Sequence, residues 1–204
     1  ILRCLVGSEM CIRDRNYTFC FDKTLRASHW VAYPMHTCYT KGDGVRSNIF
    51  PFDPDVQSVY QANLSRSYTG PYDRGHQIPA ADRKCTQAMM NQTFYSTNMT
   101  PQYGKFNQNL WGGLEGKVRD QICSDTLYVV TGAYFKGPYS STIQQSTTDA
   151  SGQICPIPSH YFKIMLRTVN GNTGRSVDSF DRASDLKAIG IWLLHEDTGN
   201  STAI

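Results

Sequence analysis

The stretch that decides the fold runs from residue 72 to residue 115 and reads YDRGHQIPAADRKCTQAMMNQTFYSTNMTPQYGKFNQNLWGGLE. It places histidine, asparagine, glutamate and basic side chains between glycine and proline turns. If residues 73 to 76 are extended before the turn at Pro79, Arg74 and His76 point to one face, because side chains alternate along a strand. The pattern therefore predicts an arginine and a histidine side by side.

Farther along the same stretch, Asn107, Trp111 and Glu115 are spaced by four residues, so a helix would carry them as one stripe. Amide and carboxylate oxygens are hard ligands of the kind magnesium prefers, and magnesium keeps several waters and needs few protein groups. A histidine facing that stripe could deprotonate one of these waters or one nearby. We expect function for Glu115, which could also be a solvated helix residue, and a core position for Trp111.

The bulk composition fits one soluble domain of 204 residues, since no run approaches eighteen consecutive apolar residues. Between Arg66 and Arg119, seven Lys/Arg face three Asp/Glu, a local charge of +4 against +3 for the whole chain. A basic surface around a metal site suits a polyanion such as nucleic acid. A solvated surface of mixed charge would account for these numbers equally well.

Seven cysteines lie apart from one another, at positions 4, 11, 20, 38, 85, 123 and 155. None forms a CxxC pair, so a zinc site is not expected. Scattered cysteines suit disulfides in an oxidising compartment, and the odd count leaves one without a partner in the chain. Cys20 and Cys38 flank a β-like segment, which makes a disulfide-tied hairpin plausible.

The first fifteen residues, ILRCLVGSEMCIRDR, resemble translated sequencing-adapter sequence joined to a gene fragment. We expect residues 1–15 to be non-native or disordered, and residues 16–204 to form one domain that is truncated at its C-terminus. The alternative is a genuine N-terminal arm.

The later part of the chain favours strands, because three runs are rich in β-branched and aromatic residues, namely 126–132, 160–169 and 188–194. Two helices are expected, at 86–94 with Thr86 as N-cap and at 107–118. The Ser/Thr/Gln/Gly-rich segment 137–153 is typical of a surface loop. This order predicts an α+β fold with a central, mostly antiparallel sheet and few helices.

Three motifs in order, YDRGHQIPAAD, TFYSTNMTPQ and FNQNLWGGLE, closely resemble the DNA/RNA non-specific endonuclease family over roughly residues 28 to 195. DRGH alone is only moderately specific, whereas the ordered set is hard to explain by chance. The resemblance implies a ββα-metal (His-Me finger) nuclease fold, with Mg²⁺ as cofactor and Mn²⁺ as a substitute ion. It implies DNA and RNA as substrates held through their phosphate backbones. No membrane partner is expected from the short apolar runs, and no obligate protein partner is evident.

The resemblance also assigns the central roles of the site. The histidine of DRGH, His76, would be the general base that activates the attacking water. Asn107 matches the metal-binding asparagine, and Glu115 matches the helix glutamate that anchors the water shell of the metal.

Three further residues match positions around this centre. Asn98 corresponds to the asparagine of the NxxPQ turn, which lies beside the base and helps to arrange the site. Arg46, in VRSNIF, looks like the upstream arginine that contacts the scissile phosphate. Arg74 would act near the leaving group or in the scaffold of the site.

The chemistry of phosphodiester hydrolysis agrees with these roles, because its barrier falls when a water is deprotonated, phosphoryl charge is neutralised and the leaving group is stabilised. A histidine with an ordinary pKa of about 6.5 is largely neutral at physiological pH and can take the proton. A metal-bound water can protonate the departing 3′ oxygen. The expected products carry 5′-phosphate and 3′-hydroxyl ends.

Two rival hypotheses belong to other functional classes. The first is a catalytically inert nucleic-acid-binding or metal-binding module on the same fold, which should have lost the base or the metal asparagine. The second is a disulfide-stabilised extracellular interaction domain, which leaves the DRGH set unexplained. From the cysteines and the resemblance we expect a secreted or periplasmic bacterial protein.

Overall fold

The computed structural model of the protein describes residues 9–12, 16–135 and 145–197. Of the stretch 1–15, only the strand β1 (Glu9–Ile12) is described, and it pairs with the next strand along the chain. The expectations for the remainder of that stretch and for residues 198–204 lie outside the described residues and stay predictions.

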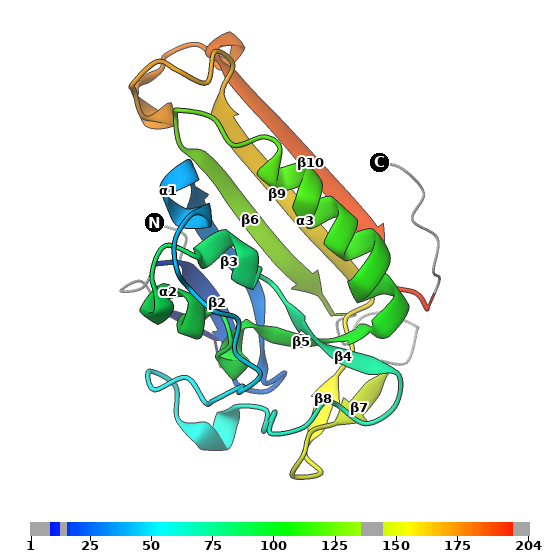
Figure 1. Ribbon diagram of the computed structural model, residues 1–204. Helices are drawn as coiled ribbons and strands as arrows, with labels where there is room; N and C mark the ends of the chain where they lie inside the picture. Colours follow the sequence, from blue (N-terminus) through cyan, green and yellow to red (C-terminus); the bar gives the residue numbers. More distant parts are fainter. Residues whose placement is uncertain (1–8, 13–15, 136–144, 198–204) are drawn as a thin grey trace.

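One antiparallel sheet forms the centre of the molecule (Figure 1). Its strands lie in the order β1 (Glu9–Ile12), β2 (Thr18–Asp22), β3 (Ala27–Met35), β6 (Leu127–Tyr134), β9 (His160–Thr168) and β10 (Leu186–Leu194). Every neighbouring pair is antiparallel. The strands expected at 126–132, 160–169 and 188–194 are confirmed as β6, β9 and β10.

The burial of these strands follows the period of two that their sequences carry. In β9, Tyr161, Lys163 and Met165 are buried, whereas Ile164 between them is exposed. Alternate side chains therefore meet the core on one face, as expected for a sheet that is covered on that side.

The helices are few and short. They are α1 (Thr37–Thr40), α2 (Gln87–Gln92) and α3 (Gly112–Arg119), with a π-helical segment at Phe106–Trp111 and 3₁₀ turns at Ser58–Tyr60, Ala80–Arg83, Ser96–Asn98, Val177–Ser179 and Ala183–Asp185. Helix α3 runs along one face of the sheet beside β9 and β10 (Figure 1) and buries Leu114 and Val118. No helix among the described residues is long and apolar enough to cross a bilayer.

The N-terminus of α2 is confirmed as expected, because the hydroxyl of Thr86 accepts a hydrogen bond from the Met89 amide at 3.2 Å. The predicted second helix is confirmed with one difference. Its first turns, Phe106–Trp111, are π-helical, so the spacing of four residues does not make one regular α-helical stripe.

Two small antiparallel sheets flank the main one. Strand β4 (Tyr72–His76) pairs with β5 (Met99–Tyr103), with His76 opposite Met99. Strand β7 (Ser146–Thr148) pairs with β8 (Ile154–Pro156).

The β7–β8 pair corrects the prediction of a loop at 137–153, of which residues 137–144 lie outside the described residues. Thr147 donates to the Thr69 carbonyl at 2.6 Å, and the Thr148 carbonyl accepts from the Thr69 amide at 2.9 Å. These contacts with a segment distant in sequence hold β7 extended, which local composition does not reveal.

The disulfide-tied hairpin between Cys20 and Cys38 is not formed. Cys20 lies opposite Trp30 in the β2–β3 register, and Cys38 lies beyond the end of β3, in α1. Cys38, Cys85, Cys123 and Cys155 carry free thiols.

We expect Gly75→Ala to destabilise the β4–β5 pair. A Cβ at this position would overlap the side chain of Gln102, which is fully buried. Overpacking of this kind costs about 1–3 kcal/mol of unfolding free energy, measurable by urea denaturation. The control is Gly113→Ala, where nothing lies within 4 Å of the new Cβ and helix propensity favours alanine. A Gly75→Ala protein as stable as the control would contradict this packing.

Candidate active site

His76 ends strand β4 inside an aromatic enclosure and is only 8% exposed. The Phe50 and Phe94 rings meet its imidazole edge to face, at centroid distances of 6.0 and 5.0 Å. The imidazole makes a hydrogen bond to the Arg74 backbone, while Nε2 is buried without a partner among the described residues. That bond therefore belongs to Nδ1, and Nε2 is the nitrogen left to accept a proton.

The surroundings of His76 hold it neutral. Burial has the largest effect, and the nearby positive charge of Arg46 adds to it, so that the pKa of His76 is lowered to about 3. The imidazole is therefore a neutral base at physiological pH.

Two arginines make cation–π contacts with the rings that enclose this histidine. The Arg74 guanidinium carbon lies 3.9 Å from the centroid of the Phe50 ring, and its Nη1 donates to the Leu64 carbonyl at 3.1 Å. The Arg46 guanidinium carbon lies 5.3 Å from the Phe94 ring centroid, and its side chain is exposed. Arg74 is thus partly committed to the scaffold, whereas Arg46 faces solvent.

The helical segment after β5 is fastened to β4 by three side chains. Asn107 Nδ2 donates to Asp73 Oδ2 at 2.9 Å, and Trp111 Nε1 donates to the His76 carbonyl at 3.3 Å. Gln108 makes a second bond to Asp73 Oδ2, also at 2.9 Å. Because the Asn107 nitrogen is engaged, its oxygen Oδ1 is the atom that can meet a cation.

Glu115 lies in α3 among charged groups. Burial raises its pKa, and the positive charge of Lys163 opposes that rise. Lys163 is itself fully buried, donates to Thr131 Oγ1 at 2.8 Å and lies 4.2 Å from the Trp111 ring centroid. Arg46 influences the pKa of both Glu115 and His76, so these side chains share one electrostatic neighbourhood.

Asn98 occupies a different kind of position from the other predicted site residues. It is fully buried, and its Oδ1 accepts from the Ile78 amide at 3.0 Å. Its Nδ2 donates to the carbonyls of Ile78 at 3.0 Å and Thr93 at 2.7 Å. All its polar atoms are used to fasten the turn after His76, so the structure favours a positioning role over contact with substrate.

Three residues of this site were not anticipated from the sequence. Asp73 belongs to the DRGH motif, and its place in that motif was the available signal. Phe50 and Phe94 carry no signal in a single sequence, because a phenylalanine near a turn most often belongs to the core.

A hydrated divalent cation fits the residues present. Asn107 Oδ1 and the Glu115 carboxylate are hard oxygen donors, and magnesium takes one or two such groups and keeps its waters. Within the described ranges no cluster of three or more His, Cys, Asp or Glu could chelate a metal. Two oxygen donors of this kind suit an ion that keeps most of its waters.

The sequence of this chain is similar to those of known nucleases. The family model described as DNA/RNA non-specific endonuclease matches residues 5–202. A nuclease of Syncephalastrum racemosum is 36% identical over 166 residues, covering 74% of this chain and 52% of that protein. Human mitochondrial endonuclease G is 28% identical over 178 residues, covering 82% of this chain and 58% of that protein. The chain spans between about half and two thirds of the length of these relatives.

The fold itself is shared with a solved structure. The crystal structure of the EndoG/EndoGI complex matches with a TM-score of 0.74 at 22% identity, covering 98% of this chain and 79% of that chain. This likeness confirms the predicted α+β, ββα-metal nuclease fold.

The expectation of a secreted or periplasmic bacterial protein is wrong. Relatives of this chain, including human endonuclease G and nuclease 1 of Schizosaccharomyces pombe, are named as mitochondrial nucleases of eukaryotes. The number of cysteines did not indicate the compartment, since Cys38, Cys85, Cys123 and Cys155 carry free thiols whereas Cys20 is disulfide-bonded.

We expect the imidazole of His76 to stay neutral from physiological pH down to about pH 5, well below the ordinary midpoint of about 6.5. Since the unfolded chain takes up this proton more readily, the free energy of unfolding should fall as pH drops from about 6.5 toward about 3. NMR titration of the metal-free protein, with the His76 signal assigned from the His76→Ala spectrum, measures the midpoint. A midpoint at or above 6.5 would contradict the enclosure.

Proposed function

This chain belongs to the DNA/RNA non-specific endonuclease family, and from that premise we propose that it hydrolyses phosphodiester bonds in DNA and RNA with His76 as general base. The observation that carries the proposal is the unpartnered Nε2 of a neutral histidine, flanked by Arg46 and Arg74. A base beside two guanidinium groups suits a phosphodiester, because its negatively charged phosphate can pair with the positively charged arginines.

In the proposed step, Nε2 of His76 takes a proton from a water whose oxygen attacks phosphorus. The bond from phosphorus to the 3′ oxygen breaks, and that oxygen takes up a proton as it leaves. The products carry a 5′-phosphate and a 3′-hydroxyl. The hydrogen bond from Nδ1 to the Arg74 backbone keeps the reactive tautomer in place.

The two arginines have distinct parts in the proposal. Arg46 is exposed and is assigned to the scissile phosphate, where it offsets the charge that grows on the phosphoryl oxygens. Arg74 is held by Phe50 and the Leu64 carbonyl, so it supplies a fixed positive field near the leaving group.

Asn107 and Glu115 would hold the divalent cation, Mg²⁺ in this proposal, with Mn²⁺ able to replace it. The cation, when bound, supplies charge neutralisation at the phosphoryl and leaving oxygens. The contact between Asp73 and the Asn107 amide nitrogen supports this assignment, because it presents the oxygen and not the nitrogen to the ion.

Room for a nucleotide adjoins the histidine. A hollow of about 330 Å³ is lined by residues 48–52 together with Asn63 and Ser65. Phe50 belongs both to this lining and to the enclosure of His76. We propose that the sugar-phosphate chain follows this surface without reading base identity, since phosphate contacts carry no sequence information. By analogy with the named relatives, we propose a mitochondrial setting.

Asp73→Ala should weaken binding of the cation by about 10–100-fold, because the Asn107 amide loses the acceptor that orients it. Mn²⁺ binding followed by electron paramagnetic resonance measures this without any substrate. Gln108→Ala is the matched control, since it removes only the other bond to Asp73. Equal Mn²⁺ affinity in Asp73→Ala and the control would remove Asp73 from the metal site.

His76→Ala should lower the rate of Mg²⁺-dependent cleavage by about 10²–10⁴-fold, the usual contribution of a general base. Nicking of supercoiled plasmid and digestion of RNA, each with and without Mg²⁺, measure the loss. His36→Ala is the control, because it also removes a histidine but one whose Nδ1 accepts a hydrogen bond from the Cys38 amide at the start of α1. It should leave the cleavage rate unchanged.

Three outcomes would count against the proposal or favour a rival function. Cleavage that survives His76→Ala would rule out the proposed base. A folded wild-type protein that binds both polymers yet cleaves neither would favour the inert nucleic-acid-binding module, and one that neither binds nor cleaves would favour an interaction domain.

A further inference from the structure

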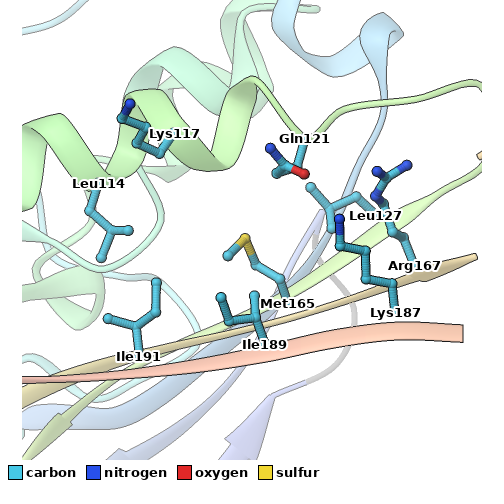
Figure 2. Close-up of a pocket in the computed structure, with 9 residues that line it drawn as sticks. All are labelled: Leu114, Lys117, Gln121, Leu127, Met165, Arg167, Lys187, Ile189 and Ile191. Carbon is cyan, nitrogen blue, oxygen red and sulfur yellow. The ribbon is translucent and has the colours of Figure 1, made fainter. Parts of the chain in front are cut away.

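A second hollow lies between helix α3 and the sheet strands β9 and β10 (Figure 2). Its volume is about 230 Å³, and its floor is made of the buried side chains of Leu114, Leu127 and Met165. Ile189 and Ile191 of β10 form the wall on the sheet side, and Ile189 is 50% exposed. This apolar space opens to solvent beside an edge strand.

The charged residues of this hollow are all basic, and the neutral Gln121 is its remaining polar residue. Its basic lining residues are Lys117, Arg167 and Lys187, and no carboxylate lines it. Across residues 9–12, 16–135 and 145–197, none of these three cations forms an ion pair. Arg167 and Lys187 gather at one end, whereas Leu114 and Ile191 lie at the other, where Lys117 of α3 points away from the sheet (Figure 2). Two of the three cations therefore lie at the end opposite the apolar pair.

We propose that this hollow binds an anionic amphiphile, with a short unbranched apolar tail on the Leu114–Ile191 side and a carboxylate or phosphate head at Arg167 and Lys187. Burying the tail removes apolar surface from water on both partners. The head satisfies cations that lack an internal partner. At about 30 Å³ per heavy atom, the space holds a tail of about eight atoms.

Nucleic acid is a poorer occupant of this hollow. Its phosphates could meet the cations, yet it offers no free chain to cover Leu114, Met165 and Ile191. The apolar side chains of the floor would then remain in contact with water, and that contact is unfavourable in free energy. The assignment does not rest on the proposed nuclease activity, because none of the lining residues belongs to the His76 site.

Titration of the ¹⁵N-labelled protein with octanoate and with octyl phosphate tests the proposal. We expect saturable amide shifts centred on Leu114, Met165 and Ile189 for both ligands. Acetate lacks the tail and octanol lacks the charge, so each should bind more weakly by about tenfold or more. Comparing octanoate with octyl phosphate distinguishes the two kinds of head group.

Variants test the two ends separately. Arg167→Ala with Lys187→Ala should lower octanoate affinity by about tenfold or more, whereas Arg182→Ala, an exposed arginine outside the lining, should not. Ile191→Trp should fill the tail end and abolish binding. Ile164→Trp places the same ring on an exposed position of the opposite face and should leave binding unchanged.

Three results would overturn the assignment. Octanol binding as tightly as octanoate would remove the role of the cations. A short oligonucleotide that shifts the same amides and competes with octanoate would make the hollow part of a nucleic-acid surface. A dimer in solution that Ile191→Trp dissociates would make it a contact between two copies of the chain.

Discussion

The hydrogen bond from the Trp111 indole to the His76 carbonyl is the contact on which the site depends. It joins the helical segment to the end of β4, and the Asn107–Asp73 bond repeats the connection three residues earlier along the strand. Trp111 is fully buried, so the helix cannot move without breaking a buried bond and opening the core. His76 and Asn107, the proposed base and the proposed metal ligand, thereby become one rigid unit, although they are 31 residues apart in sequence.

Behind this unit the protein buries charge, which normally costs stability. Lys163 lies fully buried between Thr131 and the Trp111 ring, and Asp82 is buried against Arg119 at 3.0 Å. Such pairs rarely stabilise a fold more than apolar residues would, because desolvation offsets their attraction. Here they surround Glu115, so their effect is to fix the electrostatic field of the site.

Short-range patterns predicted the fold well, since strand composition, the Thr86 cap and the antiparallel sheet all follow from local sequence. The ordered motifs predicted that His76 and Glu115 belong together, and the separate upstream match predicted that Arg46 joins them; Arg46 does influence the pKa of both. Two predictions failed because they depended on contacts between distant parts of the chain. The loop expected at 137–153 contains strand β7, which is held by Thr69. The Cys20–Cys38 disulfide is not formed, because Cys38 lies beyond the end of the strand that pairs with Cys20. The aromatic enclosure of His76 was invisible for the same reason, because Phe50 and Phe94 come from separate loops.

The π-helical turn at Phe106–Trp111 also affects how this chain can evolve. A π turn holds one residue more than an α turn, and each residue of a regular helix turns the chain by about 100°. The π turn can therefore absorb a single deletion by becoming an α turn, whereas a deletion in the regular helix between Gly112 and Leu114 would rotate the residues beyond it by about that angle. Such a rotation would carry buried side chains of α3 out of the core, so the number of residues from Gly112 to Glu115 should stay fixed among functional descendants.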